Sequence, residues 1–284
     1  MYIINKIIKK QKFPFVIFLM GILVFSSCRK EIDLDLRSIE PILVVQAEIC
    51  EGQTAEVKLS STKAFYDINV FPPLMDAVIN LTNGSGLEEK LVLGTDSIFR
   101  SKIIKGEIDE TYYLKIEYNN EIYTSSSKML PPVPIDTIIV IKPFMSGQKE
   151  PIFNLAFTDP LSKEIDYYRF LFYLNDERIM KKNNSFGSAD IYDGTIISTI
   201  FMLYDENVRD NDGEVENFLK PGDKVTFEIQ TINRSAYLFF SSLGSVSKSN
   251  PNSNIEGGAI GSFSAYSKNE KSIILANEYF PATK

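Results

Sequence analysis

The 284-residue chain contains no histidine and no tryptophan, and it has only two cysteines. The absence of histidine removes the commonest general base of enzymes and the commonest protein ligand of transition metals. Two cysteines are too few for a zinc, copper or iron site of the usual composition. We therefore expect no transition-metal site, and no glycine-rich phosphate loop suggests any other cofactor.

Positive charge is also scarce. The chain has 30 lysines and arginines against 37 aspartates and glutamates, a formal net charge of −7. This balance argues against nucleic-acid binding. No G-x-S-x-G motif is present, and no histidine is available to activate a serine nucleophile. Two carboxylates alone can hydrolyse a glycoside, but the sequence singles out no such pair. We therefore expect a protein that is not an enzyme, with a carboxylate-based hydrolase as the weakest hypothesis.

The first 27 residues are predicted to be a lipoprotein signal peptide. Four lysines precede an apolar run over 13–25, which is too short for the roughly 20 residues of a membrane-spanning helix. The run ends in Ser26-Ser27-Cys28, and small residues before a cysteine resemble a bacterial lipobox. Cys28 is therefore the predicted lipidation site. An ordinary signal peptide or a short N-terminal anchor is the alternative.

An acidic tether over 28–40 is predicted to follow the signal peptide. Cleavage before Cys28 removes four lysines, so the formal charge falls from −7 to −11. Lys30-Glu31-Ile32-Asp33 resembles the short tag that exports Bacteroidota lipoproteins to the cell surface. We expect attachment to the outer membrane, with exposure at the surface favoured over the periplasmic side. A lipidated Cys28 leaves Cys50 without a disulfide partner. Because Cys50 follows an apolar, strand-like run, we predict that its thiol is buried.

The rest of the chain has the patterns of a mainly β protein. Alternating apolar and polar residues predict strands over 55–60, 112–118 and 225–229, and Asn119-Asn120 predicts a hairpin before 122–124. Continuous apolar runs at 42–45 and 138–141 predict strands covered on both faces. Aromatic residues on both faces of 167–173 predict a strand between two packed layers. Residues 235–243 have helical spacing instead, with Asn233 or Ser235 as the cap.

Three prolines in 131–134 predict a stiff connector between two domains. Residues 41–130 have the length and strand spacing of an immunoglobulin-like β-sandwich. Residues 135–284 are predicted to form a larger β-rich domain with one short helix.

Three further segments are candidate sites. Asn250, Asn254, Gly257 and Gly258 belong to a loop that we interpret as a structural return to the last strand, or else as a ligand or partner loop. The acidic segment 205–214 lacks the carboxylates that an EF-hand requires at both ends, so we interpret it as an acidic hairpin loop, with a looser calcium site as the alternative. Ser97 and Thr137 follow aspartates and precede isoleucines, as in Bacteroidota O-glycosylation sites.

Several fragments together resemble the domain-of-unknown-function 4249 family of Bacteroidota lipoproteins. They are Cys28 with Glu31–Leu34, then 41–47, 57–65, 219–225 and 250–266. The family has no established activity and no catalytic residues. The resemblance implies an accessory lipoprotein that works beside a TonB-dependent transporter of the outer membrane.

Two functions are favoured over the carboxylate-based hydrolase. The first is a non-enzymatic outer-membrane lipoprotein that docks on a transporter barrel or captures its substrate. The second is a stand-alone surface module that binds glycans or peptides.

Overall fold

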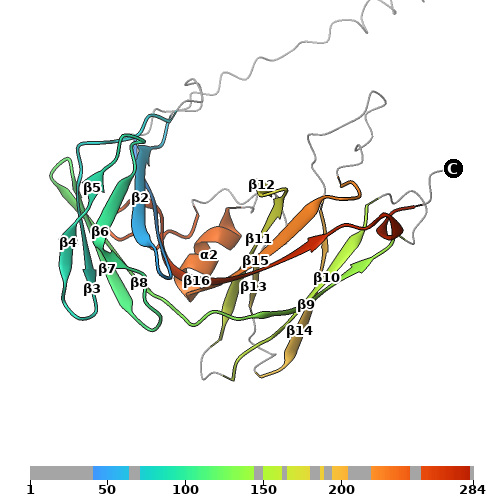
Figure 1. Cartoon of the computed structure of the whole chain (residues 1–284). Helices are drawn as coiled ribbons and strands as arrows, with labels where there is room; N and C mark the ends of the chain where they lie inside the picture. Colours follow the sequence, from blue (N-terminus) through green and yellow to red (C-terminus); the bar gives the residue numbers. More distant parts are fainter. Residues whose placement is uncertain are drawn as a thin grey trace, which may run out of the picture. The chain divides into compact units, whose positions relative to one another are not determined.

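The computed structural model describes residues 41–63, 71–143, 150–161, 165–179, 186–188, 194–203, 219–243 and 251–281. All of them belong to one compact unit, Glu40–Lys284. The strands form three sheets, and the described residues contain one α-helix, so the chain is mainly β with a sandwich-like arrangement, as predicted (Figure 1). Within the described residues, no helix has both the length and the apolar character needed to cross a membrane.

The first sandwich encloses the core built mainly from 43–129. One layer is the end of the large sheet, and the other is a separate four-stranded sheet. The first layer contains β1 (Leu43–Cys50), β2 (Thr54–Ser61), β6 (Phe99–Lys105) and β5 (Val92–Leu93). The second contains β4 (Glu88–Lys90), β3 (Val78–Asn83), β7 (Thr111–Tyr118) and β8 (Glu121–Lys128).

The second sandwich encloses a separate, aromatic-rich core. Its large-sheet layer contains β12 (Glu177–Ile179), β11 (Tyr167–Leu174), β13 (Phe186–Ser188) and β15 (Lys224–Ile232). The facing layer is the three-stranded sheet of β14 (Ile196–Met202), β10 (Ile152–Thr158) and β9 (Ile135–Ile141). Rings meet at an angle in this core: the centroids of Phe172 and Phe227 lie 5.5 Å apart with an interplanar angle of 86°.

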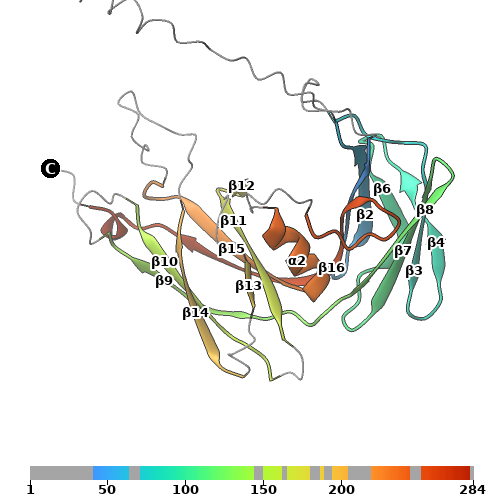
Figure 2. The same cartoon turned by 180° about the vertical axis from the view of Figure 1, so that it is seen from behind.

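One long strand, β16 (Ile260–Ile274), belongs to both sandwiches. Residues 260–266 pair in parallel with β1, and residues 267–274 pair antiparallel with β15. Figure 1 shows β16 in red beside β15, and Figure 2 shows the same strand from behind. Phe263 and Ala265 enter the first core, whereas Ile273 packs against the second. The first sandwich is therefore completed by residues more than 120 positions beyond the 131–134 connector.

The predicted alternation is present where one sheet face is buried. Tyr112, Leu114 and Ile116 of β7 are buried, while Tyr113 and Lys115 are exposed between them. Asn119 and Asn120 have φ values of 52° and 62°, which places both in the left-handed region and closes a two-residue hairpin between β7 and β8. The predicted hairpin is thus confirmed.

The helix α2 (Arg234–Ser242) lies on the large sheet and begins where the sequence indicates. Asn233 is the cap, and its side chain accepts a hydrogen bond from the Ala236 N–H at 2.9 Å. Ser235 instead donates its hydroxyl to Asn233. β11 lies beneath this helix and confirms the prediction that 167–173 is a strand between two packed layers. Tyr168, Phe170 and Phe172 enter the second core, while Tyr167 packs with α2 on the other face.

The prediction that 138–141 is covered on both faces is wrong. Ile139 on β9 is 53% exposed, and Ile138 and Val140 are the residues that pack against the second core. The three-stranded sheet is the outer layer of its sandwich, and no described element packs on its outward face. A continuous apolar run therefore stands here in a strand that is buried on one face only.

We predict a large loss of stability for Gly261→Ala. Gly261 has a φ of 147°, and a Cβ there would lie 1.9 Å from the Val45 carbonyl oxygen on β1. The substitution strains the backbone and pushes β16 away from β1, at an expected cost of about 3 kcal/mol in urea unfolding of the full chain. Gly52→Ala is the matched control, because Gly52 also has a positive φ of 72° but open space around its Cβ. We expect that control to lose about 1 kcal/mol. Equal losses would contradict the close approach of the strands.

Candidate functional site

A groove of about 450 Å³ lies over the outward face of the four-stranded sheet. Its floor comes from β3, β7 and β8, and its walls come from the loop before β16 and the start of α2. The lining residues are Thr82, Tyr113, Leu114, Lys115, Thr124, Ser125, Ser126, Ser235, Asn254 and Glu256. The groove thus gathers side chains from five segments of the chain.

Strand alternation makes the floor polar. Leu81, Leu114 and Ser125 point toward the first core, so their neighbours along each strand point outward. The register places Tyr113 between Thr82 on β3 and Ser126 on β8. The Tyr113 ring is half-exposed and supplies the flat apolar surface of a floor that also carries hydroxyl groups and the Lys115 ammonium.

Asn254 holds the loop wall against β16. Its amide donates to the Phe263 carbonyl and its side-chain oxygen accepts from the Phe263 N–H, both at 2.8 Å. The Asn254 side chain therefore pairs with β16 as a neighbouring strand would, which satisfies two polar groups of a buried residue. The Asn254 amide also donates to the Ser235 hydroxyl at 3.2 Å, so the loop is tied to α2.

The next residues attach the loop to β8. Glu256 donates its N–H to the Thr124 carbonyl at 2.8 Å and accepts the Thr124 N–H at 3.3 Å. Gly257 follows with a φ of 95°, and a Cβ there would lie 2.6 Å from the Ile122 carbonyl oxygen. Only glycine, which has no Cβ, fits where the Ile122 carbonyl comes this close to the backbone. Gly258 also has a positive φ, of 90°, and returns the chain toward β16.

The chemistry of the groove suits recognition of a polar ligand. Thr82, Thr124 and Ser126 present hydroxyl groups that both donate and accept hydrogen bonds. Lys115 brings the one cation of the lining, and the Glu117 carboxylate, 2.7 Å away, raises the pKa of Lys115. Glu256 brings the one carboxylate of the lining, whereas glycoside hydrolysis usually needs two.

The predicted loop residues divide among these roles. Asn254 lines the groove, Gly257 and Gly258 shape the loop beside it, and Asn250 lies outside the described residues. The loop returns the chain to β16 and also forms a wall of the groove. The sequence missed Thr82, Thr124 and Ser235 as groove residues. Alternation over 112–118 had marked only the face that carries Tyr113 and Lys115.

The two candidate O-glycosylation sites lie elsewhere. Thr137 is exposed on β9. Ser97 is half-buried in the turn before β6, with a φ of 63°.

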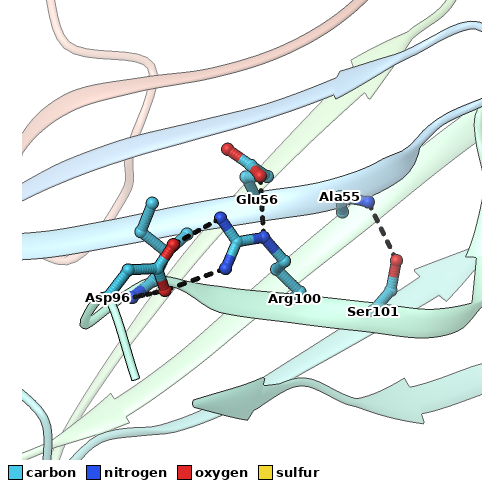
Figure 3. Close-up of polar contacts among 6 residues, drawn as sticks. Ala55, Glu56, Asp96, Arg100 and Ser101 are labelled. Carbon is cyan, nitrogen blue, oxygen red and sulfur yellow. Dashed lines mark hydrogen bonds and ion pairs between the residues drawn. The ribbon is translucent and has the colours of Figure 1, made fainter. Parts of the chain in front are cut away.

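Ion pairs and hydrogen bonds tie β6 to β2. Asp96, which precedes Ser97, is held by Arg100 at 2.7 Å, and Arg100 also binds Glu56 of β2 (Figure 3). The hydrogen bond from Arg100 lowers the pKa of Asp96 to about 2. The Ser101 hydroxyl, which accepts from the Ala55 N–H at 2.8 Å, adds a second tie between β6 and β2 (Figure 3).

A buried polar cluster lies on the large sheet away from the groove. Glu228 is 2% exposed and accepts hydrogen bonds from Tyr173, Gln230 and Lys268. Arg169 packs its guanidinium 3.9 Å from the centre of the Phe240 ring of α2, and burial lowers the pKa of Arg169. The three hydrogen bonds satisfy the Glu228 carboxylate within the protein, whereas Arg169 Nε is buried without a hydrogen-bond partner among the described residues.

The remaining candidates divide between described and undescribed segments. Cys50 is buried, as predicted, and burial raises the pKa of its thiol. Cys28 and the acidic segment 205–214 lie outside the described residues. No cluster of three or more acidic or cysteine side chains that could hold a metal ion occurs in the described part of the chain.

Comparison with known protein families gives one match. The domain of unknown function DUF4249 matches residues 29–272, which include every strand except the last two residues of β16. The chain belongs to the DUF4249 family. The resemblance drawn from the sequence fragments is thereby confirmed at the level of the family. In this DUF4249 protein the matched region contains all the residues that line the groove.

Other comparisons add little. None of the curated proteins matches this sequence. Among solved structures, the chain is similar to the native conformation of E. coli alpha-2-macroglobulin, with 10% identity and a TM-score of 0.19. The match covers 85% of this chain and 17% of that one. A TM-score this low establishes no common fold.

We predict that Asn254→Ala destabilises the protein and loosens the groove wall. The variant loses two hydrogen bonds to a buried backbone, at an expected cost of about 2 kcal/mol in urea unfolding. Hydrogen exchange at the Phe263 amide should also accelerate. Asn252→Ala is the matched control, since Asn252 is an exposed residue of the same loop, and we expect it to stay within about 0.5 kcal/mol of the wild type. Unchanged exchange at Phe263 in Asn254→Ala would disprove this role.

Proposed function

We propose that this DUF4249 protein is a non-enzymatic outer-membrane lipoprotein that captures a polar ligand in the groove and works as an accessory to a TonB-dependent transporter. The observation that carries the proposal is the groove itself. It combines the exposed Tyr113 ring, a row of hydroxyl groups and an anchored loop. A ring that covers the flat face of a sugar, with hydroxyl groups around it, is a common way to bind carbohydrate, so an oligosaccharide is the ligand class that we favour.

The proposed attachment to the outer membrane rests on the sequence. A short apolar run that ends in Ser26-Ser27-Cys28 supports cleavage and lipidation of Cys28. Several acyl chains on one cysteine hold a protein firmly at a membrane, whereas a single chain does not. The acidic residues after Cys28 support exposure at the cell surface, where the groove would meet ligands before the transporter does.

A stand-alone binding module is the second candidate. The same groove supports it, because ligand capture needs no second protein. The two functions differ in one observable respect, namely whether a transporter barrel accompanies the lipidated protein.

We predict that Tyr113→Ala weakens oligosaccharide binding. On a glycan array probed with the full chain, the signal for bound oligosaccharides should fall about tenfold, as expected when a central aromatic contact is removed. Phe71→Ala is the matched control, because Phe71 is 55% exposed, close to the 51% of Tyr113, and does not line the groove. The control should change binding less than twofold. An array without any bound glycan would refute carbohydrate capture.

We predict that the native lipidated protein co-purifies with a large outer-membrane barrel in mild detergent. Mass spectrometry of the captured material should identify that barrel, and Cys28→Ala should abolish its recovery because the tether is lost. Tyr113→Ala is the control, since an altered groove leaves the anchor intact. Recovery of the lipidated protein alone would favour the stand-alone module over the transporter accessory.

A further inference from the structure

The N-terminal sequence joins the fold at one end of the first sandwich. The Ile42 N–H donates to the Thr62 hydroxyl at 2.9 Å, and the Thr62 N–H donates to the Ile42 carbonyl at 2.9 Å. Ile42 precedes β1 and Thr62 follows β2. These two hydrogen bonds therefore fix the junction between the described fold and the sequence before it.

The turn between β5 and β6 lies at the same end. β6 lies beside β2 (Figure 1) and runs antiparallel to it, with Phe99 at its start opposite Val57. The residues just before Phe99 thus lie toward the last residues of β2. They form a turn in which the Gly94 N–H donates to the Ile98 carbonyl at 2.8 Å.

Residues 71–75 connect the end of β2 to this turn. The Lys63 ammonium, just past β2, lies 5.8 Å from the centre of the Phe71 ring. The Ser97 hydroxyl of the turn donates to the Met75 sulfur at 3.6 Å. The junction, Phe71, Met75 and the turn therefore share one end of the sandwich.

This end exposes large apolar side chains. Phe71 is 55% exposed, Met75 is 51% exposed, and Leu93, which precedes the turn, is 37% exposed. We call these three residues the apolar rim. Single exposed apolar residues are common on protein surfaces, whereas a group of them marks a contact with a protein or a membrane. The position of the rim beside the junction indicates which of these it meets.

The charges near the rim are of both signs. Arg100 binds both Asp96 and Glu56 (Figure 3). Lys63 and the exposed Asp76 add one charge of each sign. Because positive charge is not in excess, attraction to anionic lipid is not the driving force that this end offers. Burial of its apolar side chains is, and that suits a surface of zwitterionic phospholipid.

The proposed lipid on Cys28 brings a membrane to this end, and this step rests on the lipidation proposed above. From Cys28 to Pro41 the chain advances 13 residues, which span at most about 45 Å in any conformation. The membrane therefore stays within reach of the rim in every lipidated molecule. Contact between the two is intramolecular, so its effective concentration is high and a small apolar surface suffices.

We propose that the apolar rim is a membrane-docking surface. Phe71, Met75 and Leu93 enter the boundary between headgroups and acyl chains in the leaflet that holds the Cys28 lipid. The rim adds a second point of attachment to the covalent anchor, and it thereby fixes the orientation of the first sandwich on the membrane.

Docking through the rim keeps the groove away from the lipid. Val78 follows Met75 closely in the sequence and pairs with Glu117, so the end of β7 that contains Glu117 lies toward the rim. Tyr113 lies four residues back along β7, at a distance of about 13 Å for the rise of a strand. The groove is therefore set back from the docked end and stays open to ligand.

The test uses the lipidated protein in vesicles of phosphatidylethanolamine and phosphatidylglycerol, with and without phospholipid brominated on its acyl chains. The chain contains no tryptophan, so Phe71→Trp introduces a single indole whose fluorescence reports on the rim alone. We expect its emission to shift to shorter wavelength and to lose most of its intensity in brominated vesicles. Ile139→Trp is the matched control, because Ile139 is 53% exposed on β9 of the second sandwich. Its emission should not change.

Two methionines provide a readout that needs no substitution in the rim. Met75 and Met202, on β14 of the second sandwich, are both 51% exposed. Mass spectrometry after peroxide treatment should show that Met75 oxidises several-fold more slowly in the lipidated protein on vesicles than in Cys28→Ser mixed with the same vesicles. Met202 should oxidise at the same rate in both. This readout stands even if Phe71→Trp does not fold.

Flotation of the vesicles separates the two proposals. If the protein floats while Phe71→Trp stays unquenched and Met75 oxidises at its rate in solution, the anchor exists and the docking surface is overturned. A protein that does not float would contradict the lipidation and, with it, the docking surface. Equal quenching of Phe71→Trp and Ile139→Trp would also overturn the proposal. So would protection of Met75 that requires a co-purified barrel, since the rim would then contact a protein.

Discussion

The pairing of β16 with two different strands is the constraint on which the rest of the structure depends. Its first half lies parallel to β1 and its second half antiparallel to β15, so one continuous backbone joins the two ends of the large sheet and contributes to both cores. Gly261 makes the parallel half possible, because any larger residue would collide with the β1 carbonyl of Val45. Asn254 then satisfies the free side of β16 at Phe263. The same two hydrogen bonds hold the loop that carries Asn254 next to β8, and this loop forms the wall of the groove.

The buried cores and the exposed groove use different side chains of the same sheets. The aromatic side chains of the second core pack on one another, and the buried Glu228 carboxylate accepts its hydrogen bonds from within the protein. Tyr113 and the hydroxyl groups of the groove floor instead face solvent. Since the groove lies on the outward face of a sheet, substitutions of these exposed side chains should alter the ligand binding that we propose, with little effect on the fold.

Much of the local structure was predictable from the sequence, because it depends on neighbours along the chain. Alternation over 112–118 and the Asn119-Asn120 turn defined the β7–β8 hairpin, and Asn233 was one of two residues offered as the helix cap. The parallel pairing of Val44 with Ile260 was not predictable, since no local pattern links residues so distant in sequence. The groove was missed for the same reason, as Thr82, Thr124 and Asn254 meet only after the sheets assemble. The apolar run 138–141 misled because composition alone does not show whether a second layer covers a strand.

The double membership of β16 has a consequence for the order of folding. A chain that is synthesised or exported from its N-terminus presents β1 and β2 long before Phe263 and Ala265, which complete their core, become available. The first sandwich must therefore wait, incomplete, for the last part of the chain, with the unpaired edge of β1 open in the meantime. Contacts at such long sequence separation slow folding and prolong exposure to aggregation. A chaperone that holds the chain extended until its final strand arrives would act at the step where this topology is most vulnerable.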